Sequence, residues 1–494
     1  MSNMFNNFGL EFLEVYDVQY VLTRSEPRTG RRLSSMALDQ QRNWDISMAE
    51  NLQQTLHKND TSRRSQEDDG TIQTTTDTAP SWTAPPTYLP DEILLQILSH
   101  LATTTSPSTA QLTLASCCLL SHQWYAAALP LLYAHPRLYG QNFDPFVRAI
   151  CPSINLHVRA SPLAKLVKSL NMASMVHQVS RTSTARLLGR TKEGLEEFVA
   201  PQASFAINCL PALGKCVRLR SLDLSLVSES PPLPDLFRTL ERLGELRTLR
   251  LPRSAGFGVH HKATCLVWPP RLEELSLSGG IDAHFLHGVV AFPQTLRGLT
   301  IEHCPLAKGF ALVHLLRTAV RPLRNLESLK IRYMPRLSSR ALDDVLFLLP
   351  QLRKLSVSVD YITPAIFDEG HYSHLAKEPL NTFVHTPSAV LDEEEAEGPP
   401  SLQYHALHTL ELTSSGNTGI EDKISPIDIL IAMDEGCMPN LRRVRVAKSL
   451  HWHSNASGAD AEALGDALRE KWEGKGWVRG TGRRLECGWL MGEL

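Results

Sequence analysis

The chain has 494 residues and balances 50 Lys and Arg against 52 Asp and Glu, which gives a formal net charge of −2. Hydrophobic residues make up 43% and charged residues 21% of the sequence, as in ordinary globular proteins. These values exclude a general binder of nucleic acid or membrane surfaces, and the length predicts several structural units or a repeat array rather than one domain of ~100–200 residues.

Cysteine usage and hydropathy indicate the compartment. Nine cysteines, none in a Cys-x-x-Cys pair, fit reduced thiols better than a disulfide framework. No segment approaches a run of about 18 apolar residues, and the start of the chain lacks a basic stretch followed by an apolar run. We therefore expect neither secretion nor a membrane span, and a cytoplasmic or nuclear location.

Residues 1–84 form the first predicted region, and we expect it to be mostly disordered. From about residue 25 onward it is rich in Ser, Thr, Asp and Pro and poor in spaced apolar residues. Such a segment cannot bury enough apolar surface to offset the entropy lost on ordering.

An amphipathic helix is predicted for the segment "YLPDEILLQILSHL", Tyr88–Leu101. Pro90 is tolerated at the first helical position, and the acids Asp91 and Glu92 suit the positive end of a helix. A loop, Ala102–Thr109, follows. The apolar residues cover more than one stripe of the helix, so it has more apolar surface than one short neighbour needs.

A second helical stretch is predicted from Ala110 to Tyr133, with a break at Pro130. Together the helices of residues 85–135 form a unit of about 45 residues, which is small for independent stability. We expect this unit to pack against a partner.

The rest of the chain contains an internal repeat. The pattern Leu-x-x-Leu-x-Leu, with Ile, Val or Met allowed at each apolar position, recurs every 24–30 residues between Leu219 and Leu352. This interval is typical of leucine-rich repeats. The pattern begins at nine places: Val167, Leu219, Leu246, Leu272, Leu296, Leu326, Leu352, Leu407 and Leu441.

Helical patterns fill most gaps between these strings, for example before Leu249, Leu326 and Leu355. The predicted fold class is therefore α/β, a leucine-rich-repeat solenoid at residues 136–450 with parallel strands on the concave face and helices outside. An acidic insertion at about 364–404, "LDEEEAEGPPS" within it, is predicted to be a solvated loop, and the long step there leaves room for one degenerate repeat. Residues 451–494 read as a C-terminal cap made of an amphipathic helix and the short strand "RRLECGWL".

The helical unit resembles a known family. "LPDEILLQILSHL" with "LASCCLLSHQWYAAALPLLY" is similar to an F-box of the fungal type, with its Leu-Pro-x-Glu-Ile opening, its Leu-x-Ser-x-x-Trp centre and its Ala-Leu-Pro-x-Leu-Tyr close. The repeats that follow resemble the substrate domain of F-box leucine-rich-repeat proteins. The resemblance implies that the unit binds the Skp adaptor, which connects through a cullin to a RING subunit and a ubiquitin-charged E2.

The resemblance also implies which residues contact the adaptor. Two departures from the family pattern, a longer loop at Ala102–Thr109 and "AQL" in place of an acidic-leucine pair, affect how the second helix is seated. A plain helical cap that shields the open end of a solenoid is the alternative interpretation. The implied contacts are Leu89, Pro90, Ile93, Ile97, Leu98, Leu101, Leu120, Ser121 and Trp124.

Residues between the motif apolars should line the concave face, because side chains alternate along a strand. Arg332, with Lys330 and Lys354 beside it, is the preferred contact, since three neighbouring bases could receive an acidic or phosphorylated peptide. A merely solvated sheet face is the alternative for each of these charges. The candidate target contacts are Arg250, Glu274, Glu302, Lys330, Arg332 and Lys354.

Enzyme signatures are not found in the sequence. It contains no phosphate-binding GxxxxGK[ST] string, no HExxH and no GxSxG. His260, His261 and Cys265 could supply metal ligands, yet no second pair follows at a zinc-site spacing. The paired Cys117 and Cys118 are explained by burial. We therefore expect no catalytic residue, no cofactor and no metal.

These observations predict a non-catalytic substrate receptor of a cullin-RING (SCF-type) ubiquitin ligase. It would bind the Skp adaptor through the helical unit and a target protein through the repeats, with no nucleic acid and no membrane as partner. A leucine-rich-repeat interaction scaffold without a role in ubiquitination is the alternative.

Overall fold

The computed structural model describes residues 89–153, 161–175, 179–255, 267–281, 292–318, 323–367, 405–414, 423–453, 457–473 and 488–492. The region 1–84, most of the acidic insertion, and the residues His260, His261 and Cys265 lie outside these ranges, so the predictions made for them stay predictions. None of the described helices has the length and apolarity that crossing a lipid bilayer requires.

Three helices, α3 (Asp91–Thr104), α4 (Pro107–Cys117) and α5 (His122–Ala134), form the unit at the start of the described chain. Ser106 and Ser121 cap α4 and α5, where each side-chain oxygen accepts a hydrogen bond from the backbone N–H three residues on. Fully buried Leu94, Leu98 and Ala128 belong to the core of this unit.

The helix boundaries correct three predictions. The expected loop Ala102–Thr109 is mostly helical, because α3 runs on to Thr104 and Ser106 caps α4 at once. Pro90 precedes the first helical residue instead of occupying it. Pro130 lies inside α5 and does not end it; the break comes earlier, where Ser121 starts a new helix.

The helical unit is joined to the following sheet by backbone contacts. The bridge Arg137↔Asn171 runs parallel to the first strand, and Lys168 N donates to Ala134 O at 2.9 Å. Fully buried Asn142 donates from Nδ2 to Arg137 O at 2.7 Å and accepts from the backbone N of Tyr139 at 2.8 Å. The connecting elements are η1 (Gly140–Asn142), α6 (Phe143–Ile150) and η2 (Pro162–Lys165).

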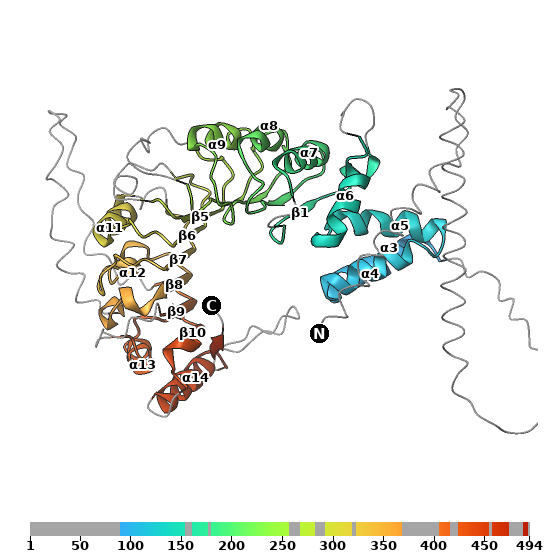
Figure 1. Cartoon of the computed structure of the whole chain (residues 1–494). Helices are drawn as coiled ribbons and strands as arrows, with labels where there is room; N and C mark the ends of the chain where they lie inside the picture. Colours follow the sequence, from blue (N-terminus) through green and yellow to red (C-terminus); the bar gives the residue numbers. More distant parts are fainter. Residues whose placement is uncertain are drawn as a thin grey trace, which may run out of the picture.

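One sheet carries the remainder of the described chain. Its eleven strands are parallel and lie in chain order. The sheet curves so that the strands line the inner side of an arch and the helices lie on its outer side (Figure 1). The strands are β1 (Ser169–Asn171), β2 (Glu197–Val199), β3 (Ser221–Asp223), β4 (Thr248–Arg250), β5 (Glu274–Ser278), β6 (Gly298–Glu302), β7 (Ser328–Arg332), β8 (Lys354–Ser358), β9 (Thr409–Thr413), β10 (Arg443–Ala447) and β11 (Gly488–Gly492).

The outer elements differ in length from repeat to repeat. The helix expected before Leu355 shrinks to the four residues of α12, and turns replace the rest of it. The outer helices are α7 (Arg181–Thr191), α8 (Leu210–Leu213), α9 (Leu233–Leu240), α11 (Gly309–Thr318), α12 (Val345–Leu348), α13 (Pro426–Asp434) and α14 (Gly458–Glu473), with the 3-10 turns η3 (Ile207–Cys209), η5 (Val359–Tyr361), η6 (Pro364–Phe367) and η9 (Lys448–Leu450).

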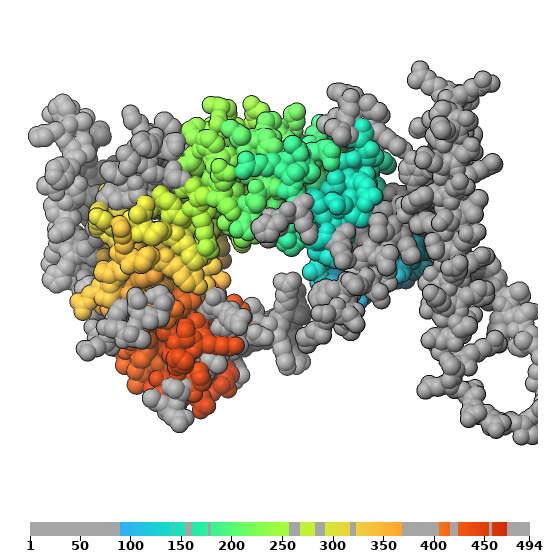
Figure 2. Space-filling model, viewed as in Figure 1, coloured from blue at the N-terminus to red at the C-terminus, as the bar shows by residue number. Residues whose placement is uncertain are grey.

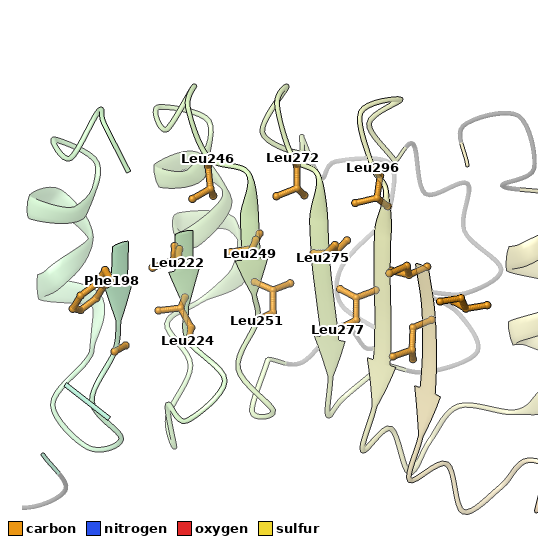
Figure 3. Packing of buried hydrophobic residues seen from close by; sticks show 14 of the residues in the cluster. Phe198, Leu222, Leu224, Leu246, Leu249, Leu251, Leu272, Leu275, Leu277 and Leu296 are labelled. Carbon is orange, nitrogen blue, oxygen red and sulfur yellow. The ribbon is translucent and has the colours of Figure 1, made fainter. Parts of the chain in front are cut away.

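Every repeat string found in the sequence contains a strand. Its apolar residues point away from the inner face and stack in rows between neighbouring strands, as Leu222, Leu249 and Leu275 do in register (Figure 3). These three leucines are at most 2% exposed. Burying a leucine stabilises by roughly 2 kcal/mol, and because each row is continuous, no repeat closes its core alone.

Strand β2 was not predicted. It fills the gap between the strings at Val167 and Leu219; Phe198 is buried within it, and Leu195 and Ala200 are buried on either side of it. Phe and Ala fall outside the residue types that the search allowed. The expected degenerate repeat between Leu352 and Leu407 does not add a strand, because β8 pairs directly with β9.

A polar side chain before the first leucine of several strings ties each repeat to the one before it. Asn325 Nδ2 donates to Gln294 O at 2.8 Å, and Gln351 Nε2 donates to Leu323 O at 3.0 Å. Thr295 makes the same kind of bond to Leu272 O at 2.7 Å. The predicted C-terminal strand joins the sheet as well, since β11 pairs with β10, and the first five residues of "RRLECGWL" lie outside the described ranges.

Candidate functional site

The helical unit exposes large apolar side chains, which we call the helical face. Soluble proteins seldom leave such residues exposed as a group, and those that do so generally use them to bind a partner. The helical face consists of Ile93 (43% exposed), Leu95 (46%), Ile97 (45%), Leu119 (51%) and Leu120 (65%).

Local structure explains this exposure. In α3, Leu94 and Leu98 turn inward and have no exposed surface, so Ile93 and Ile97, one turn apart, face outward. Leu119 and Leu120 lie in the turn between α4 and α5. Gln123 joins the first turn of α5 to the chain just before α3 by donating from Nε2 to Leu89 O at 2.6 Å.

The predicted adaptor contacts divide into three groups. Ile93, Ile97 and Leu120 lie on the helical face, and Pro90 and Ser121 are also exposed. Leu98 is a correction, because it is fully buried in the core of the unit and has no surface to offer. The partly buried remainder, packed against the core, is Leu89, Leu101 and Trp124.

Leu95 and Leu119 belong to the helical face but were missed. Leu95 lies on α3 outside the buried stripe of Leu94 and Leu98, and that position was itself a signal, because an apolar residue off the stripe has no core to enter. Leu119 lies in the turn after α4, and no sequence signal distinguished it from the buried apolar residues of the second helical stretch.

The concave face carries a shallow groove of about 260 Å³ across β4–β8. Small polar residues, including Ser276, Thr300 and Ser328, line it. Arg250 and Glu274 lie toward one end and Lys354 toward the other, in the order that the strand register gives. Five of the six predicted target contacts line this one groove, namely Arg250, Glu274, Glu302, Lys330 and Lys354.

The sixth, Arg332, is placed differently from its prediction. It is 6% exposed and reaches over β8, where it donates to Ser356 Oγ at 2.7 Å and pairs with Glu411 on β9 at 3.5 Å. Ser356 is small enough to leave room for this path. Arg332 therefore cannot be the leading surface contact, because its charge is already matched inside the sheet face.

Glu411 is the centre of a charge network that the sequence did not reveal. Besides Arg332, its carboxylate contacts Lys354 Nζ at 2.9 Å and Arg445 at 3.4 Å. Burial raises the pKa of Glu411, but the hydrogen bonds and charges of Lys354, Ser356 and Arg332 outweigh burial and hold that pKa below its usual range.

Two aromatic side chains stack at the carboxyl ends of β6 and β7. The rings of His303 and Tyr333 lie 4.3 Å apart and 10° from parallel. Both residues have left-handed backbones, with φ 55° and 52°, and the equivalent position after β5 is Gly279 with φ 81°. Burial, followed by the charge of Arg253, lowers the pKa of His303, so its imidazole is neutral near pH 7.

Nucleophilic or metal chemistry finds no support in the described part of the chain. Burial raises the pKa of the Cys118, Cys216 and Cys304 thiols to about 12, so they stay protonated and unreactive at neutral pH. Cys117 and Cys118 are both buried, as their position on the helix suggested. Within the described ranges no three His, Cys, Asp or Glu side chains gather in a way that could hold a metal ion.

Comparison with known proteins defines the class of the helical unit. Residues 87–139 match the F-box-like family, and this range contains α3, α4 and α5. The chain therefore carries an F-box-like domain, followed by a parallel sheet with helices outside.

Two curated yeast proteins are similar over a longer stretch. "F-box protein YDR306C" of Saccharomyces cerevisiae is 32% identical over 340 residues, which are 68% of this chain and 63% of that protein. "Protein pof5" of Schizosaccharomyces pombe is 28% identical over 334 residues, which are 67% of this chain and 83% of that protein. The chain thus spans less than two thirds of the budding-yeast relative, and the resemblance to F-box proteins predicted from the motifs is confirmed.

Proposed function

We propose that this chain is the substrate-recognition subunit of an SCF-type ubiquitin ligase. The helical face binds the Skp adaptor, and through it the cullin and RING subunits, while the concave sheet binds a target protein. The observation that carries the proposal is the set of exposed Ile and Leu side chains on a domain that matches the F-box-like family.

In this function the chain performs no bond chemistry and needs no cofactor. It holds a target near the charged E2, which raises the effective concentration of the target's lysines at the thioester. The repeats are leucine-rich repeats in this proposal, since their strings, interval and outer helices fit that class. The complex would act in the cytoplasm or nucleus.

Adaptor binding tests the proposal directly. We expect the full chain to co-purify with a Skp adaptor and the variant Ile93→Asn, Ile97→Asn, Leu120→Asn to lose at least about a hundredfold in affinity, because each of these side chains would be buried at the interface. Calorimetric titration measures the affinity.

The matched control is Val217→Asn, Leu226→Asn, which removes side chains that are 59% and 47% exposed but lie outside the F-box-like domain. This control should bind the adaptor as the unchanged chain does. If all three proteins bound the adaptor equally, or if the folded unchanged chain did not bind it, the helices would be interpreted as a cap on the solenoid.

A scaffold without a ligase role is the second candidate. Reconstitution with adaptor, cullin, RING subunit, E1 and E2 separates it from the first, because receptors in an active ligase receive ubiquitin on their own lysines. Adaptor binding without any such transfer would favour the scaffold.

A further inference from the structure

The concave face is electrically divided along the arch. Strands β2–β5 present three acids and one base at inward-facing positions, whereas β6–β10 present five bases and two acids. The acids and base of the first set are Glu197, Asp223, Glu274 and Arg250. The bases and acids of the second set are Lys330, Arg332, Lys354, Arg443, Arg445, Glu302 and Glu411.

The bases of the second set differ in how far their side chains are buried in ion pairs with Glu411. Arg332 is almost fully buried against Glu411, so its charge serves the sheet itself. The side chains of Lys354 and Arg445 are 44% and 39% exposed although both contact the same carboxylate. One buried acid therefore anchors three bases and leaves two of them reaching the surface with charge that it does not neutralise.

The aromatic pair lies at the edge of the same strands. His303 directly follows Glu302, and Tyr333 directly follows Arg332. A left-handed backbone costs a non-glycine residue about 1 kcal/mol, a cost that the glycine after β5 avoids. The Tyr333 ring is nevertheless 47% exposed, so the strained position displays a large aromatic side chain instead of burying it.

The groove lies across the same strands, and its lining includes Lys354 and Glu302, the residue before His303. It is shallow and partly floored by serine and threonine, which leaves room for the backbone of an extended chain rather than for a bulky domain. Its basic end adjoins Lys354, and its side adjoins Glu302 and Lys330. An extended chain that follows it would meet three bases, Arg250, Lys330 and Lys354, beside Glu274 and Glu302, and it reaches Tyr333 and Arg445 where it continues beyond the groove.

We infer that the groove and its basic end bind an extended acidic segment of the target protein, with Asp or Glu side chains at Lys330, Lys354 and Arg445 and one large apolar side chain on Tyr333. This inference rests on the proposed function, since it names what the receptor reads. Carboxylates fit better than phosphates, because Glu411 and Glu302 share the same bases and repel a dianion more strongly than a monoanion.

The first experiment selects ligands without assuming a sequence. The full chain, without any adaptor, is used to select from a display library of random ten-residue peptides. We expect the selected peptides to be enriched in Asp and Glu and to share one aromatic or large aliphatic position. The selected peptide is then labelled with fluorescein, and its dissociation constant is measured by anisotropy.

Variants locate the peptide. Lys354→Gln with Arg445→Gln should weaken binding at least about tenfold, because two charge contacts are lost while Arg332 still pairs with Glu411. Tyr333→Asn should weaken it about fivefold, and asparagine tolerates the left-handed backbone, so the fold is kept. The controls Lys165→Gln and Leu226→Asn, both at exposed sites away from the groove, should change it less than twofold.

The outcomes are separable from those of the proposed function. This inference would be overturned if no peptide were selected, or if the selected peptides had no excess of Asp and Glu. It would also be overturned if the groove variants bound the peptide equally well, or if binding required phosphoserine in place of Glu. Adaptor affinity, measured on the same proteins, should be unchanged in every groove variant. Loss of adaptor binding by the unchanged chain would overturn the proposed function while leaving the peptide result standing.

Discussion

A single buried carboxylate organises the basic half of the concave face. Sequence reasoning placed Arg332 and Lys354 together correctly, because their strings are adjacent repeats. The pairing of both bases with Glu411 on β9 was not predictable, since more than fifty residues separate the strings of β8 and β9. The sequence therefore predicted that Arg332 is an exposed base, whereas its guanidinium forms a buried ion pair with Glu411.

The same carboxylate predicts a pH dependence of stability. Glu411→Gln should lower the free energy of unfolding by about 3 kcal/mol at pH 7, because Arg332 then keeps a buried charge without a counter-ion. The pKa of Glu411 is lowered from its ordinary 4.5 in the folded chain, so its ionised form stabilises the fold above that value. That contribution is lost as the pH falls through the lower folded-state pKa.

Urea unfolding at several pH values measures this effect. The difference between the unchanged chain and Glu411→Gln should be full at pH 7 and shrink below about pH 4.5. Glu302→Gln is the control, since its pair with Lys330 is more exposed and should contribute less than about 1 kcal/mol. A difference that does not vary with pH would argue against the network.

The repeat element could largely be read from the sequence, and its failures have physical causes. Leucine strings predicted nine strands because buried rows demand the same residue type at the same spacing. Phe198 and Ala200 hid β2, since packing needs a matching volume rather than one residue type. Pro130 misled because α5 is packed against α3 and α4, and tertiary packing outweighs the lost backbone hydrogen bond.

Two glycines with the same φ allow the cost of a left-handed backbone to be measured separately from the cost of a steric clash. Gly279 and Gly436 both have φ 81°. An added Cβ at Gly279 would lie 1.6 Å from Arg253 O, whereas at Gly436 it would meet nothing within 4 Å. Gly436→Ala should therefore cost about 1 kcal/mol of stability from the strained backbone alone.

Gly279→Ala should cost at least about 3 kcal/mol, because the loop after β4 must move as well. Thermal unfolding of the two variants, followed by circular dichroism, measures the difference. Similar midpoints for both would mean that the strand ends of β4 and β5 are less closely packed than described. The candidate site shares this edge, so the test also probes the support beneath His303 and Tyr333.

At the scale of the whole molecule, the F-box-like domain is built onto the end of the sheet. The bridge at Asn171 and the buried amide of Asn142 fix the segment Arg137–Tyr139 beside β1. Figure 1 shows the helical unit and the strands of the basic half toward opposite ends of one arch, and Figure 2 shows the hollow under the arch. In the proposed function, this junction would hold a target on the concave face at a set position relative to the adaptor.

Asn142→Ala should disturb this position without touching either binding surface. It leaves Arg137 O and Tyr139 N without their partner, at a cost of about 2 kcal/mol. We expect unchanged adaptor affinity, faster proteolytic cleavage near residues 135–142, and slower ubiquitin transfer to a target fused to the selected peptide.

Asn171→Ala serves as the comparison, because that exposed side chain accepts only a local hydrogen bond from Ala173 N. It should leave cleavage and transfer unchanged. If Asn142→Ala also leaves both unchanged, the junction is not what positions the target.

The order of the strands has a consequence for synthesis. Because each strand pairs with the strand that precedes it in the chain, every repeat leaving the ribosome finds its partner already formed and adds to a finished edge. The exception is the pair β8 and β9. Strand β8 stays unpaired at this edge until the insertion has been translated and β9 follows it. We expect force-sensitive arrest peptides to report folding at each repeat, with the longest interval between the signals of β8 and β9. The growing protein would then hold an open sheet edge longest at the strand that carries Lys354.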